Sequence, residues 1–232
     1  MLPIASMKLE KITEKPGRTY NDACGTALGL DLIGERWALL VMRELMLGPR
    51  RFGDLRSGLP GISANVLTQR LEGLEAVGIV VKRKLAPPAS VQVYELTEWG
   101  MEAEPLILGL GKWAARSTLH DPNAPLSAVS MMLSFKTMFV PQRAAGAIFT
   151  VSFNVGDDAY WARIDNGVLT EGRGALDDAD LEVSGDPGLI AGVVHGFVDA
   201  AAMEHAGQIK VRGDRDVLAR FITLFEMPPK VG

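Results

Sequence analysis

The stretch from residue 52 to residue 97 constrains the fold most, because turn, helix and strand signals follow one another there in a fixed order. A short helical pattern ends at "GLPG", residues 58–61, where glycine and proline interrupt a helix. Ser63 is then a candidate N-cap, and Gly78 ends the next helix, whose apolar stripe is Val66, Leu67, Leu71, Leu74 and Val77. The β-rich runs "IVVKRKL" and "VQVYELT" flank "APPAS" and predict an antiparallel pair. Together these elements predict a winged helix-turn-helix.

The residue types on the second helix of this motif suit the major groove of DNA. Near the start of such a helix, Asn and Gln can pair with adenine edges, and Thr can pack on a thymine methyl group. The expected base-facing residues are Ser63, Ala64, Asn65, Thr68 and Gln69. Flanking basic side chains can contact phosphates, and these are Arg50, Arg51, Arg70, Lys82, Arg83 and Lys84. For the helix taken alone, an ordinary amphipathic helix with solvated charges is the alternative.

Charge divides the chain, whose net charge is −4, into two unlike halves. Residues 1–120 hold 15 Lys and Arg against 13 Asp and Glu, whereas residues 121–232 hold 9 against 15. Phosphate would repel the acidic half, so we expect that half to lie away from DNA. The segment "DPNAP", residues 121–125, is rich in turn formers. The sequence therefore predicts two domains, residues 1–120 and residues 125–232.

Helix and strand patterns alternate along both halves. Before the boundary, helices are expected over 22–33, 35–46 and 98–119. After it, helices are expected over 126–139, over 187–201 and from Asp214 to about Glu226. Strands are expected at "AIFTVSFNV", "AYWARID", "VLTEGR", "ADLEVSG" and "QIKVRGD", with an Asn-Gly hairpin turn after "AYWARID". The fold class that follows is α+β, with a mostly α N-terminal domain and an α+β C-terminal domain.

The N-terminal half closely resembles a known family. The motifs "W-x-L-L-x-x-R-E-L", "G-P-R-R-F-G-D-L", "L-P-G-I-S-x-x-V-L-T-x-R-L" and "Y-x-L-T-x-x-G" occur in this order. They resemble HxlR-type transcriptional regulators, relatives of the MarR regulators, over roughly residues 22–115. The resemblance implies a homodimer that binds a palindromic operator, with half-sites about 10 bp apart. It implies dimer contacts through residues 22–33 and 99–119, where the apolar residues are Leu28, Leu32, Leu106, Leu110 and Trp113.

The C-terminal half resembles sterol-carrier-protein-type lipid-binding domains over about residues 125–232. The signs are the strand pair with its Asn-Gly turn, "ADLEVSGDP" leading into a helix, and "G-x-I-K-V-x-G-D" before the last helix. The resemblance implies a cavity for an apolar small molecule such as a fatty acyl chain or a sterol. The expected lining residues are Met131, Phe135, Phe149, Val151, Phe153, Trp161, Val194, Phe197, Val198, Phe221 and Phe225. The alternative is that these side chains are simply the core.

Cys24, the only cysteine, stands near the N-terminus of the first expected helix. Several HxlR-type regulators respond to oxidants or electrophiles through a cysteine at this place. A helix dipole would favour its thiolate, whereas the alternative is a small buried apolar residue. His195 lies four residues before Asp199, which could make a polar anchor or a metal pair, although a satisfied, partly buried histidine is the simpler interpretation.

Other classes of protein are disfavoured by what the sequence lacks. It contains no H-E-x-x-H and no G-x-S-x-G motif, so we expect neither an enzyme nor a bound cofactor or metal. A single cysteine excludes an internal disulfide and favours the cytoplasm. No apolar run spans a membrane, and the first 18 residues lack the apolar region of a secretory signal.

The patterns predict a DNA-binding protein, and the two resemblances imply a dimeric repressor whose operator binding is modulated by an apolar molecule in the C-terminal domain. In one alternative, Cys24 is the redox sensor and the C-terminal domain is a structural brace. In another, the C-terminal half is a lipid carrier or an enzyme that is merely tethered to DNA.

Overall fold

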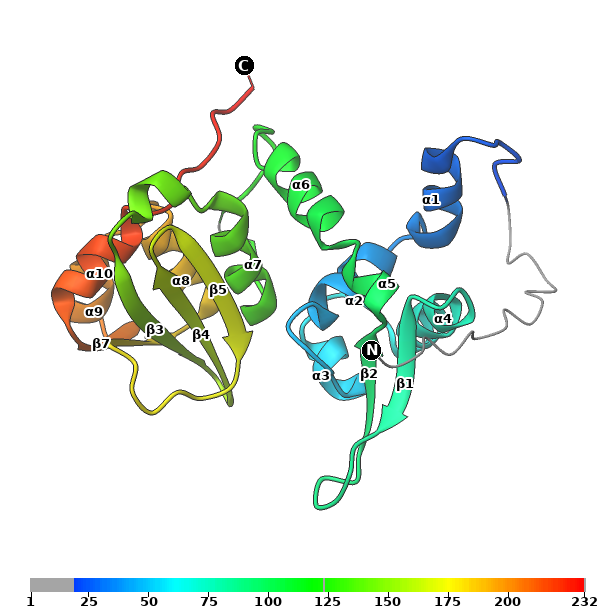
Figure 1. Ribbon diagram of the computed structural model, residues 1–232, viewed down its shortest axis with the longest axis horizontal. Helices are drawn as coiled ribbons and strands as arrows, with labels where there is room; N and C mark the ends of the chain where they lie inside the picture. The colour runs from blue at the N-terminus through cyan, green and yellow to red at the C-terminus, as the bar shows by residue number, and fades with distance from the viewer. Residues whose placement is uncertain (1–18, 123, 232) are drawn as a thin grey trace, which may run out of the picture.

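The computed structural model describes residues 19–122 and 124–231 (Figure 1). We call these ranges the N-terminal module and the C-terminal module. The segment for which no secretory signal is expected, and Asn123 of the expected boundary, lie outside the described residues.

The N-terminal module is mostly helical between residues 25 and 114. Its two strands pair antiparallel, with Val80 opposite Leu96 and Lys84 opposite Gln92, and they project from the helices as a wing (Figure 1). The elements are α1 (Gly25–Ile33), α2 (Ala38–Leu45), α3 (Phe52–Ser57), α4 (Ala64–Ala76), β1 (Val80–Lys84), β2 (Gln92–Leu96), α5 (Glu98–Met101) and α6 (Glu104–Ala114).

The C-terminal module is a five-stranded mixed sheet with helices packed against it. The strand order is β5-β4-β3-β6-β7, in which β3 and β6 run parallel and the other neighbours run antiparallel. The elements are α7 (Ala128–Met138), the short 3₁₀ helix η1 (Pro141–Ala144), β3 (Ile148–Val155), β4 (Asp158–Asp165), β5 (Val168–Arg173), β6 (Leu181–Gly185), α8 (Pro187–Val194), α9 (Ala200–His205), β7 (Ile209–Gly213) and α10 (Arg215–Ile222).

The α+β fold class is confirmed, but two expected helices are each divided in two. The helix expected over 187–201 stops at Val194 because Gly196 adopts a φ of 75° and the backbone N–H of Phe197 bonds to Gly192. Such a left-handed residue commonly ends a helix. Asp199 then caps the separate helix α9. The helix expected over 98–119 becomes α5 and α6, with a proline in the first turn of α6, where proline is tolerated.

A cluster of aromatic rings fills the space between the sheet and its helices. The ring of Phe135 on α7 lies 5.4 Å from Phe153 on β3, 5.8 Å from Phe221 on α10 and 5.5 Å from Phe225, measured between centroids. All four side chains are buried. Tilted and edge-on rings at these separations attract one another beyond the area they bury, so this cluster holds α7 and α10 on the sheet.

Helix α7 also joins the two modules. It packs against α6 and α2 of the N-terminal module, and against α8 and β5 of its own (Figure 1). The buried apolar residues of both modules consequently form one continuous cluster. None of the helices described between residues 19 and 231 is long and apolar enough to cross a membrane.

Candidate nucleic-acid interface

Two features shape the turn between α3 and α4: Ser63 caps α4, and Gly58 lies against Glu44. The Ser63 hydroxyl accepts a hydrogen bond from the backbone N–H of Val66 at 3.3 Å, so the expected N-cap is present. A Cβ atom on Gly58, at the end of α3, would lie 2.5 Å from the Oε2 atom of Glu44 on α2. A side chain at position 58 would therefore displace the Glu44 carboxylate, which glycine leaves in place.

Helix α4 presents amide and hydroxyl groups to solvent. Leu67, Leu71 and Leu74 are buried on its inner side. The outer side chains of Asn65, Thr68 and Gln69 are exposed, while Ala64 is half-buried. The N-terminal half of the helix thus carries the side chains that the sequence predicts for base contacts, with Ser63 already engaged in the cap.

The wing extends the same surface with basic side chains. Lys82, Arg83 and Lys84 of β1 are all exposed. Arg83 forms an ion pair with Glu95 on the facing strand. Arg83 is thereby partly neutralised, which leaves Lys82 and Lys84 as the stronger candidates for phosphate contacts.

Two more of the expected phosphate-binding residues lie in different settings. Arg51 is exposed and occupies the N-cap position of α3, where its backbone N–H donates to Asp54. Arg70 is mostly covered and places its Nη1 atom 3.2 Å from the Glu35 carboxylate. Arg51 remains open to phosphate, whereas Arg70 is turned toward the segment that precedes α2.

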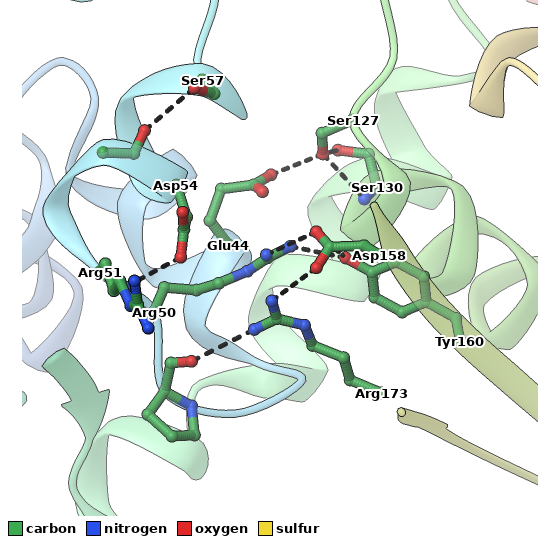
Figure 2. A network of polar contacts seen from close by, with 12 residues as sticks. Glu44, Arg50, Arg51, Asp54, Ser57, Ser127, Ser130, Asp158, Tyr160 and Arg173 are labelled. Atoms are coloured by element: carbon green, nitrogen blue, oxygen red, sulfur yellow. Dashed lines mark hydrogen bonds and ion pairs between the residues drawn. The ribbon is translucent and has the colours of Figure 1, made fainter. Parts of the chain in front are cut away.

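The position of Arg50 is inconsistent with the expected role of this residue as a phosphate ligand. Only 6% of the residue is exposed. Its Nη1 atom lies 2.8 Å from Oδ2 of Asp158, and its Nη2 atom donates to the hydroxyl of Tyr160 at 2.5 Å, both on β4 of the C-terminal module (Figure 2). A guanidinium held in this way is not available to DNA.

A second arginine completes this contact between the modules (Figure 2). Arg173, at the end of β5, donates to Oδ1 of Asp158 at 2.6 Å and to the carbonyl of Pro49 at 3.4 Å. Asp158 is therefore shared by two guanidinium groups, one from each module. We call Arg50, Asp158, Tyr160 and Arg173 the arginine bridge.

The electrostatics of the arginine bridge favour a charged carboxylate and a neutral phenol. Burial alone would raise the pKa of Asp158, but hydrogen bonds from Arg50 and Arg173 lower it. Burial raises the pKa of Tyr160 to about 12. The Tyr160 hydroxyl can then accept from Arg50 while it donates to Asp158, 3.4 Å away.

Glu44 makes a second polar contact between the modules (Figure 2). This carboxylate is 1% exposed, pairs with Arg43 at 2.8 Å and accepts a 2.6 Å hydrogen bond from the hydroxyl of Ser127. Ser127 also caps α7 by accepting the backbone N–H of Ser130. The first helix of the C-terminal module is thus attached to α2 at its N-terminus.

Sequence reasoning misses Asp158, Tyr160, Arg173, Glu44 and Ser127. Arg50 and Asp158 are 108 residues apart, and each looks like an ordinary surface charge in its own segment. No local periodicity or motif connects them, so only the packed chain reveals the pairing.

Known proteins match each module separately. Residues 32–121 match the model of the HxlR-like helix-turn-helix family. The uncharacterized HTH-type transcriptional regulator YvaP of Bacillus subtilis is 37% identical over 86 residues, which cover 37% of this chain and 79% of YvaP. This chain belongs to the HxlR-like helix-turn-helix family.

Two further similarities cover the same module. The uncharacterized HTH-type transcriptional regulator sll1512 of Synechocystis is 42% identical over 84 residues, which cover 36% of this chain and 62% of that protein. The structure of the redox regulator HypR in its oxidized form shares 33% identity and covers 39% of this chain and 94% of that chain, with a TM-score of 0.37. The curated relatives are described as transcriptional regulators rather than enzymes.

In this HxlR-like protein, the family match of the C-terminal module differs from the expected sterol-carrier resemblance. Residues 128–231 match the alkyl sulfatase C-terminal family instead. Of the expected lining residues, Phe153, Val194 and Phe221 border one small apolar space. Phe135, Phe153 and Phe221 fill the core, whereas the Trp161 ring lies against Gly172 and Phe197 is 49% exposed. The described apolar space between the sheet, α8 and α10 measures about 10 Å³, roughly one water molecule.

His195 lies at the edge of the aromatic core. Its Nε2 atom lies 2.9 Å from the Ser134 hydroxyl, which donates its own proton to the carbonyl of Met131. Nε2 is then the protonated nitrogen. Burial lowers the pKa of His195 to about 4. Because α8 ends before His195, Asp199 is not on the same helix face, and the described residues hold no cluster of three metal-ligating side chains.

Glu171 on β5 is a buried carboxyl group whose two oxygens have no hydrogen-bond partner among the described residues. Burial raises its pKa to about 8, while Lys136 opposes the shift and Glu104 adds to it. These two residues form their own ion pair at 2.7 Å, between α6 and α7.

Replacing Glu171 with glutamine should remove the loss of stability that comes from ionising a buried carboxyl group. The ordinary pKa is 4.5, so between pH 4.5 and 8 the folded chain retains a proton that the unfolded chain has lost. The free energy of unfolding must therefore fall as pH rises through this window. We expect the free energy of unfolding of Glu171→Gln, measured by denaturant titration, to exceed that of the wild type at pH 8. The difference should shrink toward pH 4.5. Parallel curves for the two proteins would contradict this, and exposed Glu75→Gln is the control.

Proposed function

We propose that this HxlR-like protein is a cytoplasmic repressor that binds a palindromic DNA operator as a homodimer. The observation that supports it best is that α4 carries exposed amide and hydroxyl side chains, while β1, which contacts α4, carries exposed lysines. Helix α4 is placed in the major groove in this proposal, and the wing follows the adjacent backbone.

The proposal assigns two kinds of contact to this surface. Asn65, Thr68 and Gln69 read base edges, while Ser63 and Ala64 let the helix N-terminus approach the groove. The side chains that contact phosphate are Arg51, Lys82, Arg83 and Lys84, with Arg70 a weaker candidate because of its ion pair with Glu35.

The homodimer is proposed to form through α1 and α6. Leu28 on α1 is exposed, as are Leu106, Leu110 and Trp113 on α6, a helix with no buried residue. Leu32 on α1 is half-buried. An apolar surface of this kind on a protein without a partner is unfavourable in water, and pairing two copies would cover it. Twofold symmetry would then match a palindromic operator.

Substitutions on α4 and on the wing should separate base reading from phosphate binding. We expect Gln69→Ala to weaken binding to a selected operator by about 1–3 kcal/mol and to relax the preference at one base pair. Lys84→Gln should weaken binding to all sequences and reduce the slope of log K against log salt by about 0.9. Fluorescence anisotropy with a duplex selected by the wild-type protein from a random library measures both. If the wild type selects no sequence, DNA binding itself is refuted.

An apolar small molecule in the C-terminal module is proposed to modulate operator binding. Ligand would favour a dimer geometry that no longer matches the half-site spacing, so repression is relieved. The filled aromatic core sets a condition on this proposal, because a ligand must first displace side chains around the 10 Å³ space beneath α8 and α10.

Native mass spectrometry provides the test of ligand control. We expect the purified dimer to carry an apolar molecule, and decanoic acid added to delipidated protein should raise the operator dissociation constant. If fatty acid binds and the DNA affinity stays the same, ligand control is refuted.

Redox sensing through Cys24 is a second candidate, favoured by the setting of the thiol. Cys24 is exposed at the N-cap of α1. The backbone N–H groups of Thr26 and Ala27 and the Thr26 side chain lower the pKa of this thiol, which favours the reactive thiolate. In this version two Cys24 thiols of a dimer are oxidised to a disulfide, and the C-terminal module acts as a brace.

Replacing Cys24 with serine should abolish any response to oxidant. We expect diamide to crosslink the wild-type protein and to release it from DNA, as seen on non-reducing gels and by anisotropy. Cys24→Ser should bind DNA equally under reducing conditions and stay bound with diamide. If the variant is also released by diamide, the thiol is not the sensor.

A further inference from the structure

Arg50 occupies the junction between the wing and the helix-turn-helix. Its backbone N–H donates to the carbonyl of Tyr94 at 2.9 Å, and the N–H of Tyr94 donates back at 2.8 Å. Tyr94 of β2 is in turn opposite Lys82 of β1. Arg50 is therefore a short third strand at the edge of the wing, and the next residue is the N-cap of α3.

The side chain of Arg50 connects this junction to the C-terminal module. From the guanidinium, contacts run through Asp158 to Arg173, and from Arg173 back to the carbonyl of Pro49 (Figure 2). The contacts therefore begin and end on Pro49 and Arg50, two neighbouring residues in the six-residue segment that connects α2 to α3. Because a buried guanidinium is strongly disfavoured without a carboxylate, the position of this segment depends on Asp158.

The Glu44–Ser127 contact acts on the other end of α3. The Oε2 atom of Glu44 lies against Gly58, where α3 ends, while Oε1 accepts from Ser127. Polar contacts with the C-terminal module thus act on both ends of α3, one at its N-cap beside the wing and one at the turn into α4.

We infer that the arginine bridge sets the position of the wing and of α3 relative to α4, so that the C-terminal module determines DNA affinity without touching DNA. Arg50 is in this view a positioning residue, and Asp158 is its anchor. The inference rests on the proposed DNA-binding function and is independent of any ligand or of Cys24.

Removing the charge of Asp158 distinguishes positioning from simple electrostatics. Loss of a negative charge from a DNA-binding protein should tighten DNA binding if the charge acts only at long range. If Asp158 positions Arg50, Asp158→Asn should instead weaken binding, by about tenfold for a coupling of ordinary size. Asp157→Asn, at the exposed neighbouring position, removes the same charge outside the bridge and is the matched control.

The experiment measures operator affinity against salt concentration for the full-length chain. Its probe is the duplex selected by the wild-type protein, and its variants are Asp158→Asn, Arg50→Gln and the double variant. We expect each single variant to lose about tenfold in affinity with an unchanged salt slope, and the double variant to lose no more than either alone. Lys84→Gln serves as the comparison, because loss of a true phosphate contact reduces the slope of log K against log salt.

Each other outcome overturns the inference. A slope reduced by about 0.9 for Arg50→Gln would make Arg50 a phosphate ligand. Additive losses, or wild-type or tighter binding by Asp158→Asn, would show that the bridge does not position the wing. Should Arg50→Gln fail to fold by circular dichroism, Arg173→Gln leaves the Arg50–Asp158 pair in place and must still weaken binding. If the wild type selects no duplex, the proposed function fails first and this inference falls with it.

Discussion

The ion pair between Arg50 and Asp158 is the contact on which the arrangement of the two modules depends. A guanidinium that is 6% exposed is tolerated only with a charged partner, and the partner comes from a strand more than one hundred residues away. The pair therefore selects one packing of the modules among those that apolar contacts alone would allow. Its cost of desolvation is offset by two further hydrogen bonds, one from Arg50 to the Tyr160 hydroxyl and one from Arg173 to Asp158.

The aromatic core of the C-terminal module couples α7 to the sheet. Phe135 of α7 is locked among Phe153, Phe221 and Phe225, so α7 moves with the sheet rather than independently of it. The same helix is attached to α2 through Ser127 and packs on α6. A rearrangement within the sheet would consequently reach both the helix-turn-helix and the helix proposed to form the dimer. The C-terminal module is well placed to influence DNA binding whether it senses a ligand or acts as a brace.

Local patterns account for most of the secondary structure. Ser63 caps α4 as expected, Leu67, Leu71 and Leu74 form its buried side, and the basic hairpin pairs in the expected segments. The two divided helices were not foreseen, because apolar periodicity continues through the interruptions near Gly196 and Pro105. In the C-terminal module the pattern located the strands, yet it could not distinguish side chains that line a cavity from side chains that fill a core, because both are apolar.

Spacing and residue type within short segments were enough to predict the winged helix-turn-helix, the α+β class and the exposed side of α4. The role of Arg50 emerges only from the packed chain. Charge can be counted along a chain, but the function of a charge depends on its partner, and that partner is chosen by the packing of distant strands. Arg50 and Arg51 are identical and adjacent in sequence, yet one is buried against Asp158 and the other is open to solvent. The physical reason is the bridge to Tyr94, which directs one side chain into the C-terminal module, while the next residue begins α3 at the surface.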